Sequence, residues 1–177
     1  MNEMNIYIDG NNLYRSAKEL GFDIDYFKFR GWLRQKYNPT FVYLFIGLVP
    51  ARAKFYEYLQ RCGYILVFKQ TISVGENIKG NCDADLVLKC VTDFYTNSFS
   101  SCILMTGDGD FGCLVEFLKE KKSINCVVAP DRNKCSILLR NKNIEINFLN
   151  EHYHKFSNIV TLKKAPSMDV STQGSSS

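Results

Sequence analysis

Two carboxylates stand two residues apart in the stretch Thr106–Phe111, which reads Thr-Gly-Asp-Gly-Asp-Phe and follows an apolar segment. Turns at the carboxyl ends of strands are where open α/β sheets bind their ligands. Loops held by a rigid scaffold also carry much of a protein's chemistry. Asp108 and Asp110 are therefore the first candidates for a functional site.

Further acidic residues occupy similar places along the chain. Asp9 follows the apolar segment 5–8, and Asp83 with Asp85 opens the helix expected after a polar loop. In a parallel sheet the strand ends share one edge, so Asp9 and Asp108 can face each other across a crevice. A helix cap or turn explains any single one of these aspartates, and the helix dipole explains Asp85. Their recurrence at three such positions favours a shared site.

A metal ion is the ordinary partner of such a cluster. Two carboxylates about 5 Å apart repel each other by roughly 3 kcal/mol at an effective dielectric near 20. Hard cations such as Mg²⁺ or Mn²⁺ prefer carboxylate oxygens and leave positions open for phosphate and water. A site of this kind activates water for in-line attack on a phosphoryl group. The chemistry that fits is metal-assisted hydrolysis of a phosphodiester.

Two competing motifs were weighed. The glycines of this turn, continued by Gly112, form the Gly-x-Gly-x-x-Gly pattern of dinucleotide-binding proteins, with Asp131 roughly 20 residues later. We reject it because Asp108 and Asp110 would point negative charge at a pyrophosphate. The segment 151–154, Glu-His-Tyr-His, could hold a metal, but a solvated segment near the tail is the better interpretation.

Length and composition indicate one globular domain with a tail. The chain has 177 residues, of which 46% are hydrophobic and 23% charged, with a net charge of +4. No apolar run approaches the ~20 residues that span a bilayer, and no secretory signal is evident, so we expect a cytoplasmic protein. Its seven cysteines contain no Cys-x-x-Cys pair and are assigned no chemistry. We predict a domain over residues 1–156 and a disordered tail over 157–177.

The predicted elements alternate between strands and helices. Strands are expected at 5–8, 40–46, 64–68, 101–106, 124–129 and 145–149. Helices are expected between them, including one over 133–141, and residues 70–82 form the one long polar loop. This alternation predicts an α/β fold with a mostly parallel central sheet.

Three segments resemble a known family. Residues 7–12, 79–86 and 106–111 resemble, in order and spacing, the three motifs of the NYN domain family, most closely its LabA-like branch within the PIN-like nuclease superfamily. The resemblance covers roughly residues 5–150 and includes 133–139, which is similar to the family's last helix. It implies a Rossmann-like three-layer α/β/α sandwich whose acidic residues bind Mg²⁺ or Mn²⁺ and cleave RNA.

Positions carried over from the family give each residue an expected role. The resemblance implies that the amide of Asn12 lies near the scissile phosphate and that Thr106 or Ser136 supports the site. Cys82 stands where the family often has Val, and Asp85 is often Glu or apolar in this branch, so the role of Asp85 stays open. The implied metal-binding and catalytic set is Asp9, Asp83, Asp108 and Asp110.

The expected function is a metal-dependent ribonuclease that acts on RNA, single-stranded RNA above all. Asp9 and Asp108 would hold the metal directly, while the other two acids complete its shell or orient water. Basic residues at the same rim are candidates for contacts with the RNA backbone, namely Lys79, Arg132 and Lys134.

Two other functions are consistent with the same residues. One is a catalytically silent RNA-binding or regulatory module, and the other is a small-molecule phosphatase or nucleotide-binding enzyme on a similar sheet. A homodimer is also consistent with the sequence, whereas no membrane partner is expected.

Overall fold

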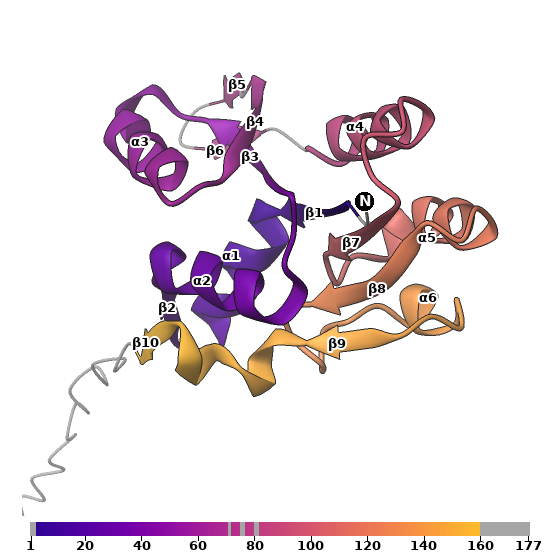
Figure 1. The fold of residues 1–177 in the computed structure, drawn as a ribbon. Helices are drawn as coiled ribbons and strands as arrows, with labels where there is room; N and C mark the ends of the chain where they lie inside the picture. Colours follow the sequence, from indigo (N-terminus) through magenta and orange to yellow (C-terminus); the bar gives the residue numbers. More distant parts are fainter. Residues whose placement is uncertain (1–2, 71, 75–76, 80–81, 160–177) are drawn as a thin grey trace, which may run out of the picture.

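A six-stranded parallel sheet forms the centre of the protein (Figure 1). The structure is a computed structural model that describes residues 3–70, 72–74, 77–79 and 82–159. The strands lie in the order β4-β3-β1-β7-β8-β9, and every neighbouring pair is parallel. Their bounds are β1 (Met4–Asp9), β3 (Phe41–Leu48), β4 (Ile65–Gln70), β7 (Ser101–Met105), β8 (Ile124–Ala129) and β9 (Ile146–Phe148). The predicted α/β fold is confirmed.

The central strands are buried on both faces. In β1 every residue from Asn5 to Asp9 is buried, and in β7 every residue from Cys102 to Met105 is buried. Continuous apolar runs of this kind are typical of parallel strands covered by helices on both sides. The register places Ile6 between Val42 and Ile103, so the strands align without a slip at the centre.

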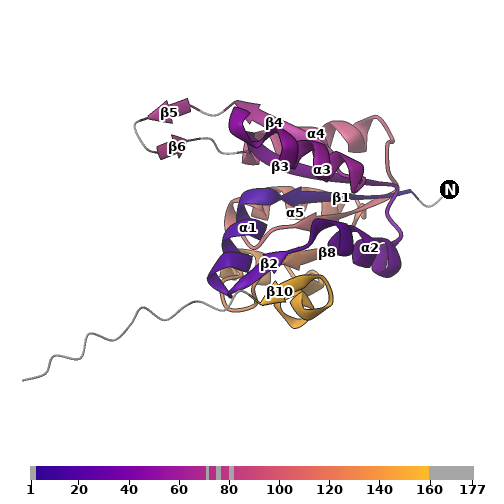
Figure 2. The same ribbon diagram turned by 90° about the vertical axis from the view of Figure 1, so that its left-hand side faces the viewer.

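Helices cover both faces of the sheet and complete three layers (Figures 1 and 2). On one face Leu13, Phe29 and Leu59 pack over the sheet, and on the other face Leu86 and Leu114 do so. The first set comes from α1 (Gly10–Glu19), α2 (Tyr26–Tyr37) and α3 (Ala53–Arg61). The second face carries α4 (Asp83–Tyr95), α5 (Gly112–Glu120) and α6 (Ile137–Arg140).

The order of the strands reverses beside β1. From β1 the chain passes to β3 and β4 on one side, and then returns to β7 on the other side. The crevice at the carboxyl ends of β1 and β7 is therefore the topological switch point, where open α/β sheets bind ligands. Residues that directly follow these two strands are neighbours although almost 100 residues separate them.

Part of the predicted polar loop 70–82 is instead a pair of short strands. The antiparallel strands β5 (Ile72–Val74) and β6 (Asn77–Lys79) project beyond the end of β4 (Figure 2). Their apolar residues alternate with polar ones, as expected for strands, but three residues are too few to stand out in the sequence.

A second short sheet and the extent of one helix also differ from the predictions. β2 (Phe22–Ile24) pairs with β10 (Ser157–Ile159), although Ser157 was expected to begin the tail. The helix expected over 133–141 is only α6, because Asp131 accepts a hydrogen bond from the N–H of Asn133 and holds that segment in a turn. The remaining 3₁₀ turns are η1 (Pro50–Arg52), η2 (Gly109–Phe111), η3 (Leu149–Glu151) and η4 (Tyr153–Lys155).

Two general properties complete the description. In the described part of the chain, no helix has both the length and the apolar character needed to cross a membrane. All seven cysteines are free thiols, and five of them are buried. Residues 160–177, which hold most of the predicted tail, lie outside the described residues.

Candidate metal centre

Asp9 ends β1 and caps α1. Its Oδ1 accepts a hydrogen bond from the N–H of Asn12 at 3.0 Å, and only 7% of the residue is exposed. The next residue, Gly10, must be glycine, because a Cβ there would lie 2.6 Å from the backbone oxygen of Phe45. The absent side chain lets α1 begin against β3 and so fixes Asp9 at the strand end. Gly10 is not among the predicted site residues, although a glycine directly after a strand-ending aspartate is a signal that the sequence offers.

The turn after β7 is joined to Asp9 by a buried hydroxyl. Thr106, which is fully buried, donates to Oδ2 of Asp9 at 3.1 Å and accepts from the N–H of Asp108 at 3.2 Å. Asp108 in turn caps η2, because its Oδ1 accepts from the N–H of Asp110 at 3.0 Å. Thr106 thus links the two turns of the switch point through hydrogen bonds.

Ser136 supports the same turn from outside. Its N–H donates to the carbonyl of Gly107 at 2.9 Å, and its hydroxyl accepts from the N–H of Leu138 and caps α6. A Cβ at Gly109 would collide with the hydroxyl of Ser136. The segment before α6 therefore packs directly on the turn that carries the aspartates.

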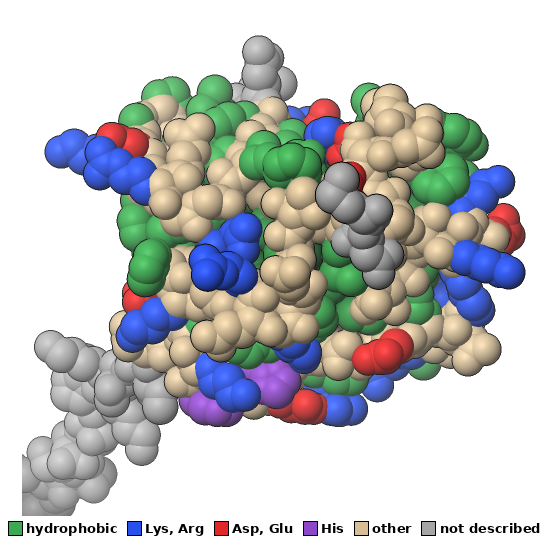
Figure 3. All heavy atoms as spheres, viewed as in Figure 1, with side chains coloured by type: hydrophobic (Ala, Val, Ile, Leu, Met, Phe, Trp, Pro, Cys, Tyr) green, Lys and Arg blue, Asp and Glu red, His purple; other side chains and the backbone are tan. Residues whose placement is uncertain are grey.

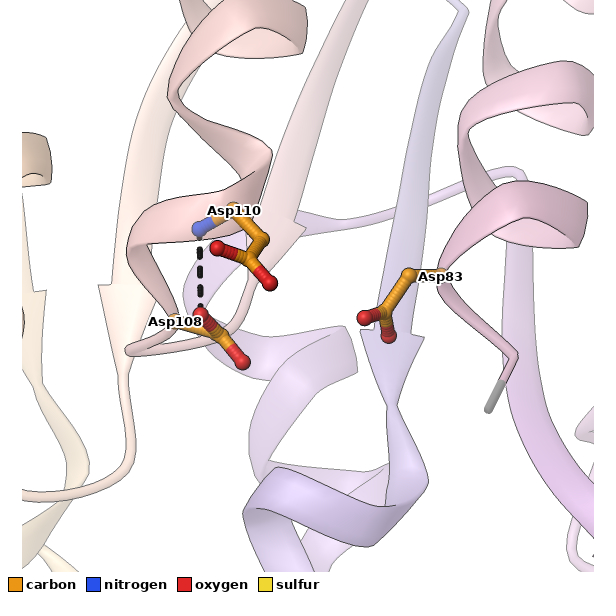
Figure 4. Close-up of side chains that lie close together, drawn as sticks. All are labelled: Asp83, Asp108 and Asp110. Atoms are coloured by element: carbon orange, nitrogen blue, oxygen red, sulfur yellow. Dashed lines mark hydrogen bonds between the residues drawn. The ribbon is translucent and has the colours of Figure 1, made fainter. Parts of the chain in front are cut away.

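Three aspartates converge at this crevice (Figure 4). Asp83 comes from the first turn of α4, while Asp108 and Asp110 come from the turn after β7. Each offers one carboxylate oxygen, and these oxygens all lie within 4.8 Å of one another. Asp110 is exposed and the other two are half-buried. Within the described part of the chain, neither Asp108 nor Asp110 forms an ion pair with a basic residue.

Asp9 lies beside this group rather than within it. Burial raises the pKa of Asp9, and the negative charges of Asp83 and Asp108 raise it further. The N–H of Asn12 and the hydroxyl of Thr106 act in the opposite direction, because each donates to the carboxylate. The structure therefore brings three of the predicted metal-binding residues together and couples the fourth to them electrostatically.

A carboxylate cluster of this composition fits a hard divalent cation. Its donors are all oxygens, and Mg²⁺ and Mn²⁺ prefer such oxygens to nitrogen or sulfur. The repulsion that raises the pKa of Asp9 is the repulsion that a bound cation removes.

Comparison with known proteins identifies the family of the chain. The sequence model of the NYN domain matches residues 3–148. The chain belongs to the NYN domain family. A crystal structure of a protein of unknown function from Vibrio parahaemolyticus superimposes on this NYN domain with a TM-score of 0.70 and 20% identity, over 89% of this chain and 96% of the other. That likeness concerns the fold. No functionally curated protein matches the chain.

Asn12 has a structural partner in this NYN domain. Its Oδ1 accepts a hydrogen bond from the N–H of Gly107 at 2.8 Å, and the residue is half-buried. The predicted contact of Asn12 with a scissile phosphate stays a prediction. The side chain of Lys79, on β6, lies outside the part that the structure describes.

The remaining charged candidates have partners on the surface. Asp85, in the first turn of α4, faces Lys69 at 3.7 Å between carboxylate and ammonium. Arg132 pairs with Glu151, and its guanidinium carbon lies 4.1 Å from the centroid of the Phe148 ring. Lys134 forms an ion pair with Glu19 of α1, and both ion pairs are solvent-exposed. Exposed pairs of this type contribute little to stability.

Proposed function

We propose that this NYN domain is a cytoplasmic, metal-dependent ribonuclease of the LabA-like branch that hydrolyses phosphodiester bonds in single-stranded RNA. The observation that supports the proposal most strongly is the convergence of Asp83, Asp108 and Asp110 at the switch point of the sheet. The family is nuclease-like, and the crevice carries the acidic donors that such chemistry needs.

The residues of the site would have separate roles in metal binding, proton transfer and positioning. Asp83, Asp108 and Asp110 would hold Mg²⁺ or Mn²⁺, which supplies positive charge to the phosphoryl oxygens and lowers the pKa of water. Asp110 is exposed and can accept a proton from an attacking water. Asp9 borders the crevice, and Thr106 holds Asp9 and the Asp108 turn in a fixed relation.

The open position of the acids favours a polymeric substrate. Asp110 faces solvent, and exposed basic side chains stand on the loop after β8, which neighbours β7. A single RNA strand bound along this edge could place one phosphate at the acids while Arg132 and Lys134 contact neighbouring phosphates. A small phosphomonoester would gain nothing from those outer cations, which makes a phosphatase the weaker alternative.

Cleavage of an end-labelled single-stranded RNA tests the proposal. We expect cleavage with Mn²⁺ or Mg²⁺, none with chelator, and a loss of roughly 100-fold or more in Asp108→Asn. Glu120→Gln is the matched control, since Glu120 is an exposed acid at the far end of α5 and should be neutral.

Three results would contradict the proposal. RNA binding without cleavage in any metal would favour the silent module. Full activity in Asp108→Asn would remove this site. Faster hydrolysis of p-nitrophenyl phosphate than of RNA would favour the phosphatase.

A further inference from the structure

A recess between α2 and the segment that follows β9 gathers a second set of functional groups. It has a volume of about 290 Å³ and is lined by Trp32, Gln35, Lys36, His152 and Lys155. The α2 residues belong to the last two turns of that helix, whereas His152 and Lys155 come from the segment after β9. Figure 3 shows the histidines beside Lys and Arg side chains at the lower edge of this face.

The lysine of α2 is held in the wall of the recess by aromatic rings. The ammonium of Lys36 lies 5.1 Å from the ring centroid of Trp32 and 5.1 Å from that of Tyr37. Cation–π contacts of this kind position an ammonium without neutralising its charge. Lys155 stands at the same recess from η4. The two cations therefore come from segments far apart in the sequence and point to one space.

The lining of the recess contains no carboxylate. The acid beside it, Glu151, accepts hydrogen bonds from the guanidinium of Arg132. The recess thus keeps a net positive charge.

The histidine of the recess responds to this charge. The centroids of the His152 and Trp32 rings lie 5.5 Å apart. Partial burial lowers the pKa of His152, and the positive charges of Lys36, Lys155 and His154 lower it further, while Glu151 opposes them. An anion in the recess would reverse the effect of the cations and favour the protonated ring.

We propose that this recess binds the phosphate group of a nucleoside monophosphate. Lysine ammoniums and a protonated imidazole are strong donors to phosphate oxygens. The volume lies near the lower end of the range for small-ligand pockets, about 300–1,000 Å³, which suits a mononucleotide rather than a polymer. The amide of Gln35 and the edge of Trp32 remain for the nucleoside part. None of the three clustered aspartates is among the residues that line the recess, so Asp108→Asn separates this proposal from the proposed nuclease activity.

The only tryptophan of the chain makes this site directly observable. Because Trp32 lines the recess, intrinsic fluorescence of the full chain reports on its occupation. We expect AMP to change the fluorescence saturably at constant ionic strength, more tightly than inorganic phosphate does, and more tightly at pH 6 than at pH 8. Lys155→Gln should weaken AMP binding about tenfold. Lys54→Gln on α3 is the matched control, and both it and Asp108→Asn should bind AMP as the unmodified chain does.

Defined results would overturn the proposal. An equal effect of sodium chloride, or a linear response to AMP, would show that no site exists. Unchanged affinity in Lys155→Gln would remove the recess as the site. Equal affinity for phosphate and AMP would overturn the nucleotide assignment, because the nucleoside would then contribute nothing. Since Asp108→Asn is included, failure here is distinct from failure of the nuclease proposal.

Discussion

The side-chain oxygen of Asn12 accepts a hydrogen bond from the backbone N–H of Gly107 at 2.8 Å. Asn12 belongs to the first turn of α1, and Gly107 belongs to the turn after β7. The bond therefore crosses the switch point and fixes the turn of Asp108 relative to Asp9. The amide of Asn12 is part of the framework of the site, whatever it contacts in a substrate.

Replacing Asn12 should consequently weaken the fold as well as the site. Asn12→Ala leaves the N–H of the buried residue Gly107 without its acceptor, so we expect the free energy of unfolding to fall by about 1–2 kcal/mol. The measurement is urea denaturation followed by circular dichroism. Asn11→Ala is the matched control, since Asn11 is the exposed neighbour on the same helix. Equal stability of the two variants would contradict the structural role.

The main architecture could be predicted from the sequence because the central strands are long and buried on both faces. Residues 126–129 are a continuous apolar run, and the strand that contains them, Ile124–Ala129, has the predicted bounds. Asp9 and Asp108 could be found because they stand at the ends of such strands, where the parallel topology collects them at one edge, and Asp83 because it opens a helix. Fold class and candidate site were thus accessible from local pattern and position alone.

Contacts between distant segments were not accessible in this way. β2 and β10 have three residues each and pair across most of the chain, so neither shows a usable pattern. The place of Asp9 beside the cluster depends on the hydroxyl of Thr106 and on the N–H of Asn12 taking its two oxygens. His152 was expected in a solvated segment, but its ring packs on Trp32, and no spacing in the sequence indicates that contact.

The raised pKa of Asp9 predicts a specific dependence of stability on pH. Between the ordinary value of 3.8 and the raised value, the folded chain binds more protons than the unfolded chain. The stability of the metal-free protein should therefore fall as pH rises through that window. Asp9→Asn removes this loss and keeps an acceptor for Asn12, so its melting temperature in chelator should match the unmodified chain near pH 4 and exceed it at pH 7.

The matched control for that experiment is Asp25→Asn at the cap of α2. Asp25 also accepts a backbone hydrogen bond at a helix start, but it faces Lys28 instead of other carboxylates. This variant should show no gain at pH 7. If the difference in melting temperature between Asp9→Asn and the unmodified chain were the same at every pH, the role of burial and charge at Asp9 would be contradicted.

Two glycines should respond in opposite directions to the same substitution. A Cβ at Gly10 would lie 2.5 Å from Cγ2 of Ile46 and 2.6 Å from the backbone oxygen of Phe45, which cannot move freely. We expect Gly10→Ala to lower the free energy of unfolding by about 2–3 kcal/mol. At Gly31, within α2, a Cβ meets nothing within 4 Å, so Gly31→Ala should raise it by about 0.5–1 kcal/mol. Chemical denaturation of the two variants measures both signs, and a tolerated Gly10→Ala would mean that α1 can begin farther from β3.

Metal binding itself can be separated from catalysis by thermal stability. A cation that binds only the folded chain stabilises it by about 2.7 kcal/mol at one hundred times its dissociation constant, so Mn²⁺ should raise the melting temperature and chelator should reverse the rise. Asp110→Asn removes one carboxylate and keeps the backbone N–H that Asp108 caps. It should lose most of the Mn²⁺ effect and yet melt no lower than the unmodified chain in chelator, because the mutual repulsion of the acids is reduced.

Asp85→Asn should keep the Mn²⁺ effect, since Asp85 faces Lys69 and lies outside the group of three. If Asp110 served only the stability of the fold, Asp110→Asn would instead melt lower in chelator and respond to Mn²⁺ as the unmodified chain does. That result would contradict a role of Asp110 in metal binding.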